Sequence, residues 1–140
     1  MPTWILYAIL AMFFAGITSI LAKYGLAGIS ADFGLGIRTT VIFVIIASLN
    51  LAGERLREFS NLTALQAILL VASGITTSLS WIFYYRAMKD GLVSYVAAID
   101  KASILITLVL SLVLLKEPVT LRVVLGGILI LGGMLVLVWK

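Results

Sequence analysis

The chain contains no cysteine and no histidine among its 140 residues. Their absence excludes disulfides, thiol chemistry, histidine-ligated metal sites and histidine proton relays, and we expect neither a metal nor a cofactor. Charged residues are also scarce, at 11% against the roughly 25% of a soluble domain. Hydrophobic residues make up 63%. A chain this small cannot bury that much apolar surface away from water, so its expected solvent is the lipid bilayer.

The chain also lacks a basic stripe, although its net charge is +4. Its ten Lys and Arg residues are scattered singly between apolar runs, which is typical of membrane anchors and orientation signals. We therefore expect no nucleic-acid partner. The first apolar run has no positively charged start and is followed by four more runs, which indicates a membrane span rather than a signal peptide.

Five long apolar runs predict five transmembrane helices, at about 3–22, 33–53, 62–85, 92–115 and 119–139. Each has roughly 20 residues, enough to cross a hydrocarbon core of about 30 Å at about 1.5 Å per residue. The connections are short, so the predicted fold is all-α: one five-helix membrane domain over residues 1–140. Asn61 or Ser60 is the expected N-cap of the third helix.

An odd number of spans places the two termini on opposite sides of the membrane. The basic residues divide into four on the N-terminal side and five on the C-terminal side, with Lys101 deeper. They are Arg55, Arg57, Lys116 and Arg122, against Lys23, Arg38, Arg86, Lys89 and Lys140. The positive-inside rule needs an imbalance to orient a protein. Either features outside this count select one orientation, or the chain has dual topology and forms an antiparallel homodimer, which we favour because many transporters consist of inverted repeats.

Polar residues within predicted spans are energetically costly and therefore informative. Asp100 lies about 12 Å into the fourth span, near the midplane. Polar residues recur at helical spacing in three spans: Asp100, Ser103, Thr107 and Ser111; Ser73, Thr77, Ser80 and Tyr84; and Gly16, Ser19 and Lys23. The hydroxyl residues indicate either a water-accessible cavity or hydrogen bonding within and between helices. Asp100 favours a substrate or coupling site, with a structural ion pair as the alternative.

Asp100 requires a charged partner, a water-filled cavity or a proton at that depth. Lys101 and Arg86 are its candidate charge partners, and so are Lys23 and a residue of a second copy. Lys101 is about 100° away around the helix, so we expect it to pair poorly with Asp100. In the last span, small residues that allow another helix to approach closely predict helix packing, including the dimer interface. These are Gly126, Gly127, Gly132 and Gly133.

The sequence resembles the drug/metabolite transporter superfamily in its EamA-type branch. The resemblance rests on Trp81-Ile-Phe-Tyr-Tyr-Arg86-Ala-Met-Lys89-Asp-Gly91, Asp100-Lys101-Ala-Ser103, Leu115-Lys-Glu117-Pro118 and the glycines of Gly126–Gly133. It implies secondary transport without ATP, often export. Typical members have ten spans in two inverted repeats, whereas this chain resembles the single-repeat class, which is expected to dimerise. The glutamate in the first helix of related four-span exporters has no counterpart between Met1 and Gly28.

Together these features predict a secondary active transporter that exports small polar or zwitterionic metabolites by alternating access. The expected location is the plasma membrane of a prokaryote, and the expected partners are lipid, substrate and a second inverted copy. Two alternatives stay open: a membrane assembly or binding subunit that needs a different inverted partner, and a channel. An enzyme is not expected, because no serine–lysine, paired-aspartate or metal constellation is evident.

Overall fold

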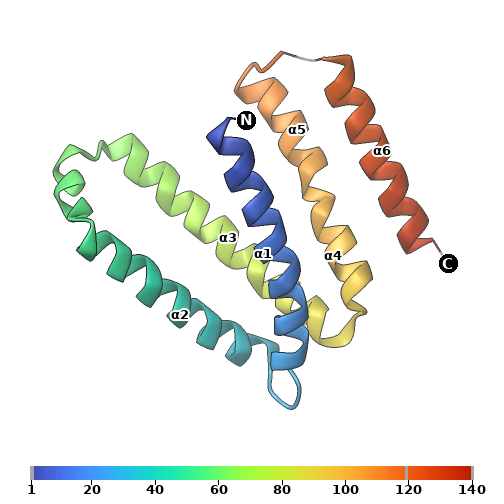
Figure 1. Cartoon of the computed structure of the whole chain (residues 1–140), viewed down its shortest axis with the longest axis horizontal. Helices are drawn as coiled ribbons and strands as arrows, with labels where there is room; N and C mark the ends of the chain where they lie inside the picture. Colours follow the sequence, from blue (N-terminus) through green and yellow to red (C-terminus); the bar gives the residue numbers. More distant parts are fainter. Residues whose placement is uncertain (1, 119, 140) are drawn as a thin grey trace. The chain divides into compact units, whose positions relative to one another are not determined.

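Every regular element of the described residues is helical in the structure, a computed structural model that describes residues 2–118 and 120–139. The elements are α1 (Thr3–Gly25), α2 (Ala31–Ala52), the short 3₁₀ helix η1 (Arg55–Asn61), α3 (Ala64–Asp90), α4 (Val93–Lys101), α5 (Ser103–Leu114) and α6 (Leu121–Val138) (Figure 1). Five helical segments are long and apolar enough to cross a membrane, with α4 and α5 together forming one, Val93–Leu114. This confirms the predicted all-α class and its five spans. The predicted start of the last span, residue 119, and the basic residue Lys140 lie outside the described residues.

Several helices continue beyond the apolar runs that predicted them. α1 extends to Gly25, and α3 extends to Asp90 rather than ending at residue 85. An apolar run ends where charged residues begin, but backbone hydrogen bonding continues into the headgroup region. As a result Asp32 and Arg86, which the sequence placed in connections, lie in the first turn of α2 and near the end of α3.

The N-terminus of α3 has a reciprocal cap that differs from the predicted one. The Thr63 backbone N–H donates to Gln66 Oε1 at 3.0 Å, and the Gln66 backbone N–H donates to Thr63 Oγ1 at 3.3 Å. This is a capping box. The prediction of Asn61 or Ser60 as the cap was wrong, because both residues belong to η1, where the Ser60 hydroxyl donates to the Arg57 carbonyl.

The chain forms two compact units, Met1–Asp90 and Gly91–Lys140. In the first unit α3 contacts both α1 and α2. The buried apolar residues of the described chain that belong to this unit are Ala22, Leu26, Ala31, Leu35, Tyr85 and Met88, and Met88 is fully inaccessible. All six lie at the end where α1 and α3 finish and α2 begins. The core of the unit is therefore small and lies at one end of its helices.

The connection between α1 and α2 packs closely against the start of α2. Gly28 has a φ of +76°, which favours glycine at the turn. A Cβ atom placed on Gly34 would lie 2.6 Å from Leu26 Cδ2 and 3.4 Å from Ile29 Cδ1. Glycine at position 34 thus allows the two side chains of the connection to pack directly on the α2 backbone.

In the second unit, α6 contacts both α4 and α5. The predicted continuous fourth helix is interrupted at Ala102, which separates α4 from α5. Here the Ala102 N–H donates to the Ile99 carbonyl at 3.0 Å, and the Leu105 N–H donates to the Ala102 carbonyl at 2.9 Å. Both bonds span three residues rather than four, so the break is a short 3₁₀ turn. It directly follows Asp100 and Lys101.

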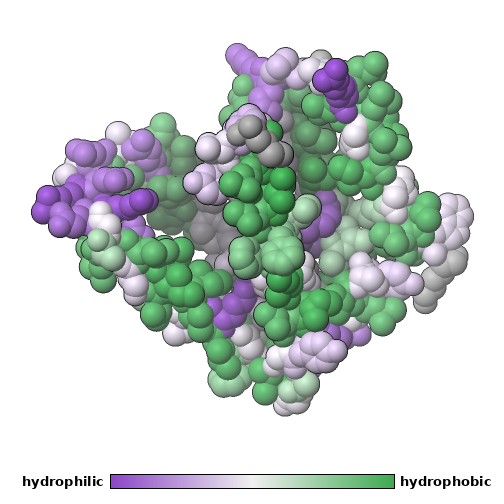
Figure 2. Space-filling model, viewed as in Figure 1, coloured by the Kyte–Doolittle hydropathy of each residue, from purple (hydrophilic) through white to green (hydrophobic). Residues whose placement is uncertain are grey.

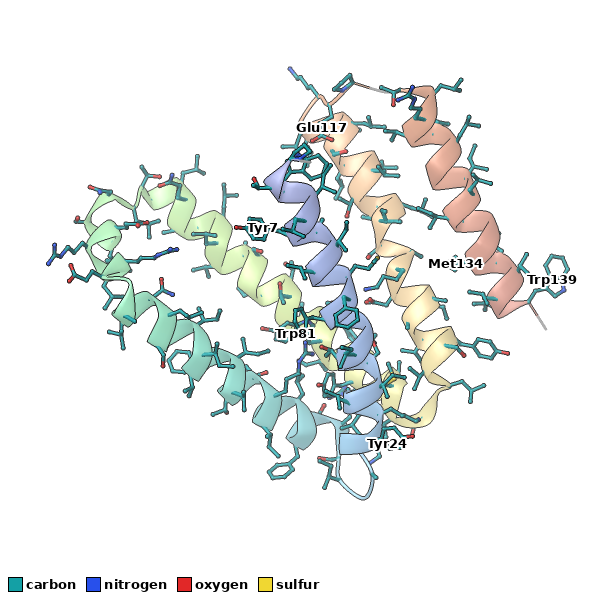
Figure 3. The ribbon with its side chains drawn as sticks, viewed as in Figure 1. Tyr7, Tyr24, Trp81, Glu117, Met134 and Trp139 are labelled. Carbon is teal, nitrogen blue, oxygen red and sulfur yellow. The ribbon has the colours of Figure 1, made fainter. Side chains whose placement is uncertain are left out.

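The surface of the helices is largely apolar. Large hydrophobic side chains are exposed along the spans, and hydrophilic residues gather over η1 at the left of Figure 2. The most exposed large hydrophobic residue described is Trp139, 84% accessible, which extends from the end of α6 in Figure 3. Tryptophan at a span end suits the headgroup region. Such a surface is compatible with lipid rather than with water.

Candidate functional site

A hydrogen bond between two predicted site residues joins α1 to α3. The hydroxyl oxygens of Ser19 and Tyr84 lie 2.8 Å apart. Ser19 Oγ also donates to the Ala15 carbonyl at 3.1 Å. A serine hydroxyl carries one hydrogen, so Tyr84 must be the donor in the contact between the helices. The structure therefore brings together the predicted polar faces of the first and third spans at this level.

Lys23, another predicted site residue, connects α1 to the C-terminal end of α3. Its Nζ atom donates to the Met88 carbonyl at 2.8 Å and to the Lys89 carbonyl at 2.9 Å. The last carbonyl groups of a helix lack intrahelical partners and carry partial negative charge, so a cation stabilises them. The Lys89 ammonium group in turn donates to the Ile29 carbonyl in the connection. These bonds hold the buried end of the unit together.

Arg38 of α2 lies over two aromatic rings of α3. Its guanidinium carbon is 4.3 Å from the centroid of Trp81 and 5.4 Å from that of Tyr85. Both distances suit a cation–π interaction. The sequence indicates for Arg38 only a role as an orientation signal. The available signal was the i, i+4 spacing of Trp81 and Tyr85, which puts both rings on one helix face.

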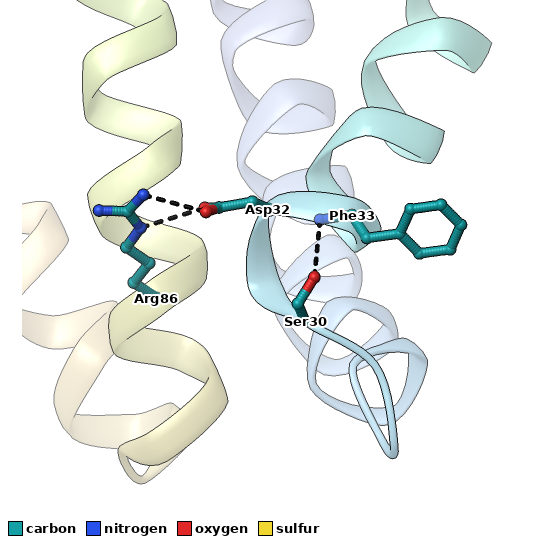
Figure 4. Close-up of polar contacts among 4 residues, drawn as sticks. All are labelled: Ser30, Asp32, Phe33 and Arg86. Carbon is teal, nitrogen blue, oxygen red and sulfur yellow. Dashed lines mark hydrogen bonds and ion pairs between the residues drawn. The ribbon is translucent and has the colours of Figure 1, made fainter.

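Arg86 and Asp32 form a bidentate ion pair between α3 and α2. Arg86 Nε donates to Asp32 Oδ1 at 3.1 Å, and Nη2 donates to Oδ2 at 3.0 Å, as Figure 4 shows. The Ser30 hydroxyl accepts from the Phe33 N–H at 3.3 Å and caps α2 beside the pair. Arg86 was expected to be a charge partner of Asp100, but its ion pair in the structure is with Asp32. The difference arises because Asp32 was placed in a connection rather than in a helix facing α3.

Among the open cavities of the first unit, two have charged residues of α2 in their lining. One, of about 660 Å³, lies between α2 and α3, and Asp32 and Arg86 form its charged part. The other, of about 370 Å³, has Thr18 of α1, Arg38 of α2 and Tyr85 of α3 in its lining. Both volumes lie within the range of small-molecule sites, about 300–1,000 Å³.

The hydroxyl residues on the predicted polar faces of the spans mostly form hydrogen bonds within their own helices. The Thr77 hydroxyl donates to the Ser73 carbonyl at 2.8 Å, and the Thr107 hydroxyl donates to the Ser103 carbonyl at 3.1 Å. Such bonds use the only hydroxyl hydrogen, but the oxygen can still accept from a ligand or water. Ser80 is exposed on α3. These contacts agree with the alternative in which the hydroxyl groups bond within their helices. They also leave the hydroxyl oxygens able to accept hydrogen bonds along each polar face.

Asp100 pairs with the residue that follows it. Lys101 Nζ lies 3.1 Å from Asp100 Oδ2, with 33% of the Asp100 side chain and 69% of the Lys101 side chain exposed. The expectation that these two residues pair poorly was wrong. Regular helix geometry separates neighbours by about 100°, but the flexible four-carbon stem of lysine allows its ammonium group to reach the adjacent carboxylate. The pair places both signs of charge within the fourth span.

One glycine of the last span contacts α5. Gly127 is buried, and a Cβ atom there would lie 3.3 Å from Leu108 Cδ1 and 3.8 Å from Leu105 Cδ2. At Gly126, Gly132 and Gly133 an added Cβ would meet no described atom within 4 Å. The predicted close packing through glycine thus occurs at Gly127 within the unit.

Five helices that are long and apolar enough to cross a membrane define a polytopic integral membrane protein. The EamA-like transporter family matches residues 2–139, and the chain belongs to that family as a single repeat. The chain is similar to a Sinorhizobium sp protein described as "Uncharacterized transporter in cobO 3'region", with 36% identity over 135 residues and 96% of each chain covered. No solved structure matches. The family is one of transporters and not of enzymes. Within the described residues, no group of three or more His, Cys, Asp or Glu residues could hold a metal ion.

Proposed function

We propose that the protein is a secondary active transporter that exports small polar or zwitterionic metabolites across the plasma membrane of a prokaryote by alternating access. The observation that carries the substrate class is the Asp100–Lys101 pair beside the break in the fourth span. Interrupted helices commonly form the substrate sites of transporters, because they turn polar backbone groups toward a cavity. A carboxylate and an ammonium group at this position complement a substrate that also carries both charges.

The transport unit in this proposal is an antiparallel homodimer. Two observations support it: the even distribution of basic residues between the two faces, four against five, and the large apolar surface that one five-span chain exposes. A second inverted copy would complete the pseudo-symmetric arrangement of inverted-repeat transporters. Each copy would contribute one Asp100, and the two carboxylates would bind either a substrate ammonium group or a proton. Competition between the two would couple their fluxes.

The remaining predicted site residues would line the pathway of such a dimer. They are Ser103, Thr107, Thr77, Ser80, Tyr84, Ser19 and Lys23. The free acceptor positions of the hydroxyl groups would bind water or substrate donors along the helices. Three glycines of α6 have open space where a Cβ atom would lie, and they would allow close approach of the second copy: Gly126, Gly132 and Gly133.

Counterflow in proteoliposomes tests transport and the role of Asp100. Wild type should exchange members of a panel of labelled amino acids and small amines across a pH series. Asp100→Asn should reduce exchange about tenfold or more, as for losing a charged hydrogen bond. The matched control is Glu54→Gln, because Glu54 forms an equally short exposed ion pair, 3.1 Å, with Arg57 outside the spans. Normal exchange by Asp100→Asn at every pH would make Asp100 a structural residue, and no exchange by wild type would contradict the transporter proposal.

Cysteine labelling tests the antiparallel arrangement, and the chain has no native cysteine to interfere. Single cysteines at Ala27 and at Asn61 place one label at each end of the spans, and both residues are exposed. Ala27 is preferable to its neighbour Gly28, whose positive φ disfavours a side chain. A membrane-impermeant maleimide should label each position from both sides of the membrane. If every copy is labelled from one side only, the protein does not have dual topology.

A further inference from the structure

The cavity between α2 and α3 changes from charged to apolar along α2. Asp32, in the first turn of α2, and Arg86 form its charged end, and Thr40 lies about two helical turns farther along. Phe43, also in the lining, is eleven residues from Asp32, or about 17 Å by helical rise. Ile82 adds an apolar side chain from α3. Polarity therefore falls from the end of the span toward its middle, as it does in the surrounding bilayer.

This cavity lies on a different face of α3 from the proposed transport pathway. Ile82 and Arg86 are four residues apart and share one helix face. Tyr84 is two residues from each, which is about 200° around a helix. Tyr84 bonds to α1, whereas the cavity has its lining on α2 and α3. The cavity is therefore separate from the polar face of α3 that carries Thr77, Ser80 and Tyr84.

The ion pair at the charged end retains binding capacity. Both side chains are more than half exposed, at 57% for Arg86 and 62% for Asp32. Their bonds use Arg86 Nε and Nη2, and a guanidinium group has five N–H donors. Among the described residues, Nη1 has no hydrogen-bond acceptor, so it can donate to a phosphate while Asp32 accepts from an ammonium group. The pair complements a ligand with adjacent negative and positive charges.

We propose that this cavity binds a zwitterionic phospholipid whose headgroup has a primary ammonium and a phosphate, as in phosphatidylethanolamine. The lipid phosphate contacts Arg86 and the lipid ammonium group contacts Asp32. The part of the acyl chain nearest the headgroup lies along Phe43 and Ile82. A soluble zwitterion shares the headgroup chemistry. The position of the charges at the span end and the apolar inner half favour the lipid, because lipid headgroups and acyl chains are arranged in the same order.

Native mass spectrometry of protein released from nanodiscs tests the proposal. The nanodiscs contain equal amounts of dioleoyl phosphatidylethanolamine and dioleoyl phosphatidylglycerol. Wild type should retain one tightly bound phosphatidylethanolamine per chain, and Arg86→Gln should reduce its occupancy about tenfold. Asp32→Asn should shift retention toward phosphatidylglycerol, because Arg86 then lacks a neighbouring carboxylate. The control is Arg57→Gln, which breaks the exposed Arg57–Glu54 pair outside the cavity and should leave retention unchanged.

Three outcomes would overturn the proposal. The first is equal retention by wild type, Arg86→Gln and Arg57→Gln. The second is an unchanged lipid preference in Asp32→Asn, which keeps Arg86 and so remains informative if Arg86→Gln fails to fold. The third is displacement of the lipid by soluble phosphoethanolamine at equal concentration, which would make the ligand a soluble zwitterion. Retention of lipid requires no transport, so this test and the counterflow assay can fail independently.

Discussion

The hydrogen bond between Ser19 and Tyr84 allows a quantitative test of how α1 packs on α3. Tyr84→Phe removes the donor, and Ser19→Ala removes both the acceptor and the bond to the Ala15 carbonyl. A double-mutant cycle separates the interaction between helices from that local bond. Buried neutral hydrogen bonds contribute about 0.5–1.5 kcal/mol, and those between membrane helices average about 0.6 kcal/mol. We expect a coupling free energy of about 1 kcal/mol, which is roughly a fivefold change in the unfolding equilibrium constant.

The assay is reversible unfolding in mixed micelles with increasing dodecyl sulfate, monitored by helical circular dichroism. Thr18 provides a matched control, since it neighbours Ser19 on α1 and its hydroxyl also donates to a carbonyl four residues earlier, that of Phe14, at 2.8 Å. Thr18→Val combined with Tyr84→Phe should be additive within about 0.3 kcal/mol. A coupling below about 0.3 kcal/mol for the Ser19–Tyr84 cycle would refute the contact and the helix faces inferred from it.

Two further substitutions test the packing of α6 and the start of α3. Gly127→Leu should destabilise the protein by about 1–3 kcal/mol, because Leu105 and Leu108 occupy the space that the new side chain needs. Gly126→Leu, at a position with open space, should have a much smaller effect in the same unfolding assay, and equal losses would contradict the assigned contact. Thr63→Ala should cost about 0.5–2 kcal/mol by removing the capping box. An unchanged unfolding midpoint for Thr63→Ala would show that the cap does not stabilise α3.

The interactions between helices were harder to predict than the helices themselves. The sequence predicted that Ser19 and Tyr84 lie on polar helix faces, and in the structure their hydroxyl groups form a hydrogen bond. It did not identify Asp32 as the partner of Arg86, because the two residues are 54 positions apart and the ends of the apolar runs placed both outside the helices. The position of Arg38 over Trp81 depends likewise on which face of α2 contacts α3. Helical periodicity shows which residues share a face, but not which neighbouring helix that face meets.

The sequence alone determined that this protein is a membrane protein with five helical spans and belongs to a transporter class. The five spans depend on local quantities, since each span must be long and apolar enough and must satisfy its own backbone hydrogen bonds in lipid. The transporter class rests instead on the resemblance of the sequence motifs to a known family. Only the tertiary structure decided the ion pairs, the break after Asp100 and Lys101, and the cavity between α2 and α3. Arginine and lysine side chains are long enough to reach several partners. Their choice of partner is set by the packing of whole helices, which no single segment of the sequence contains.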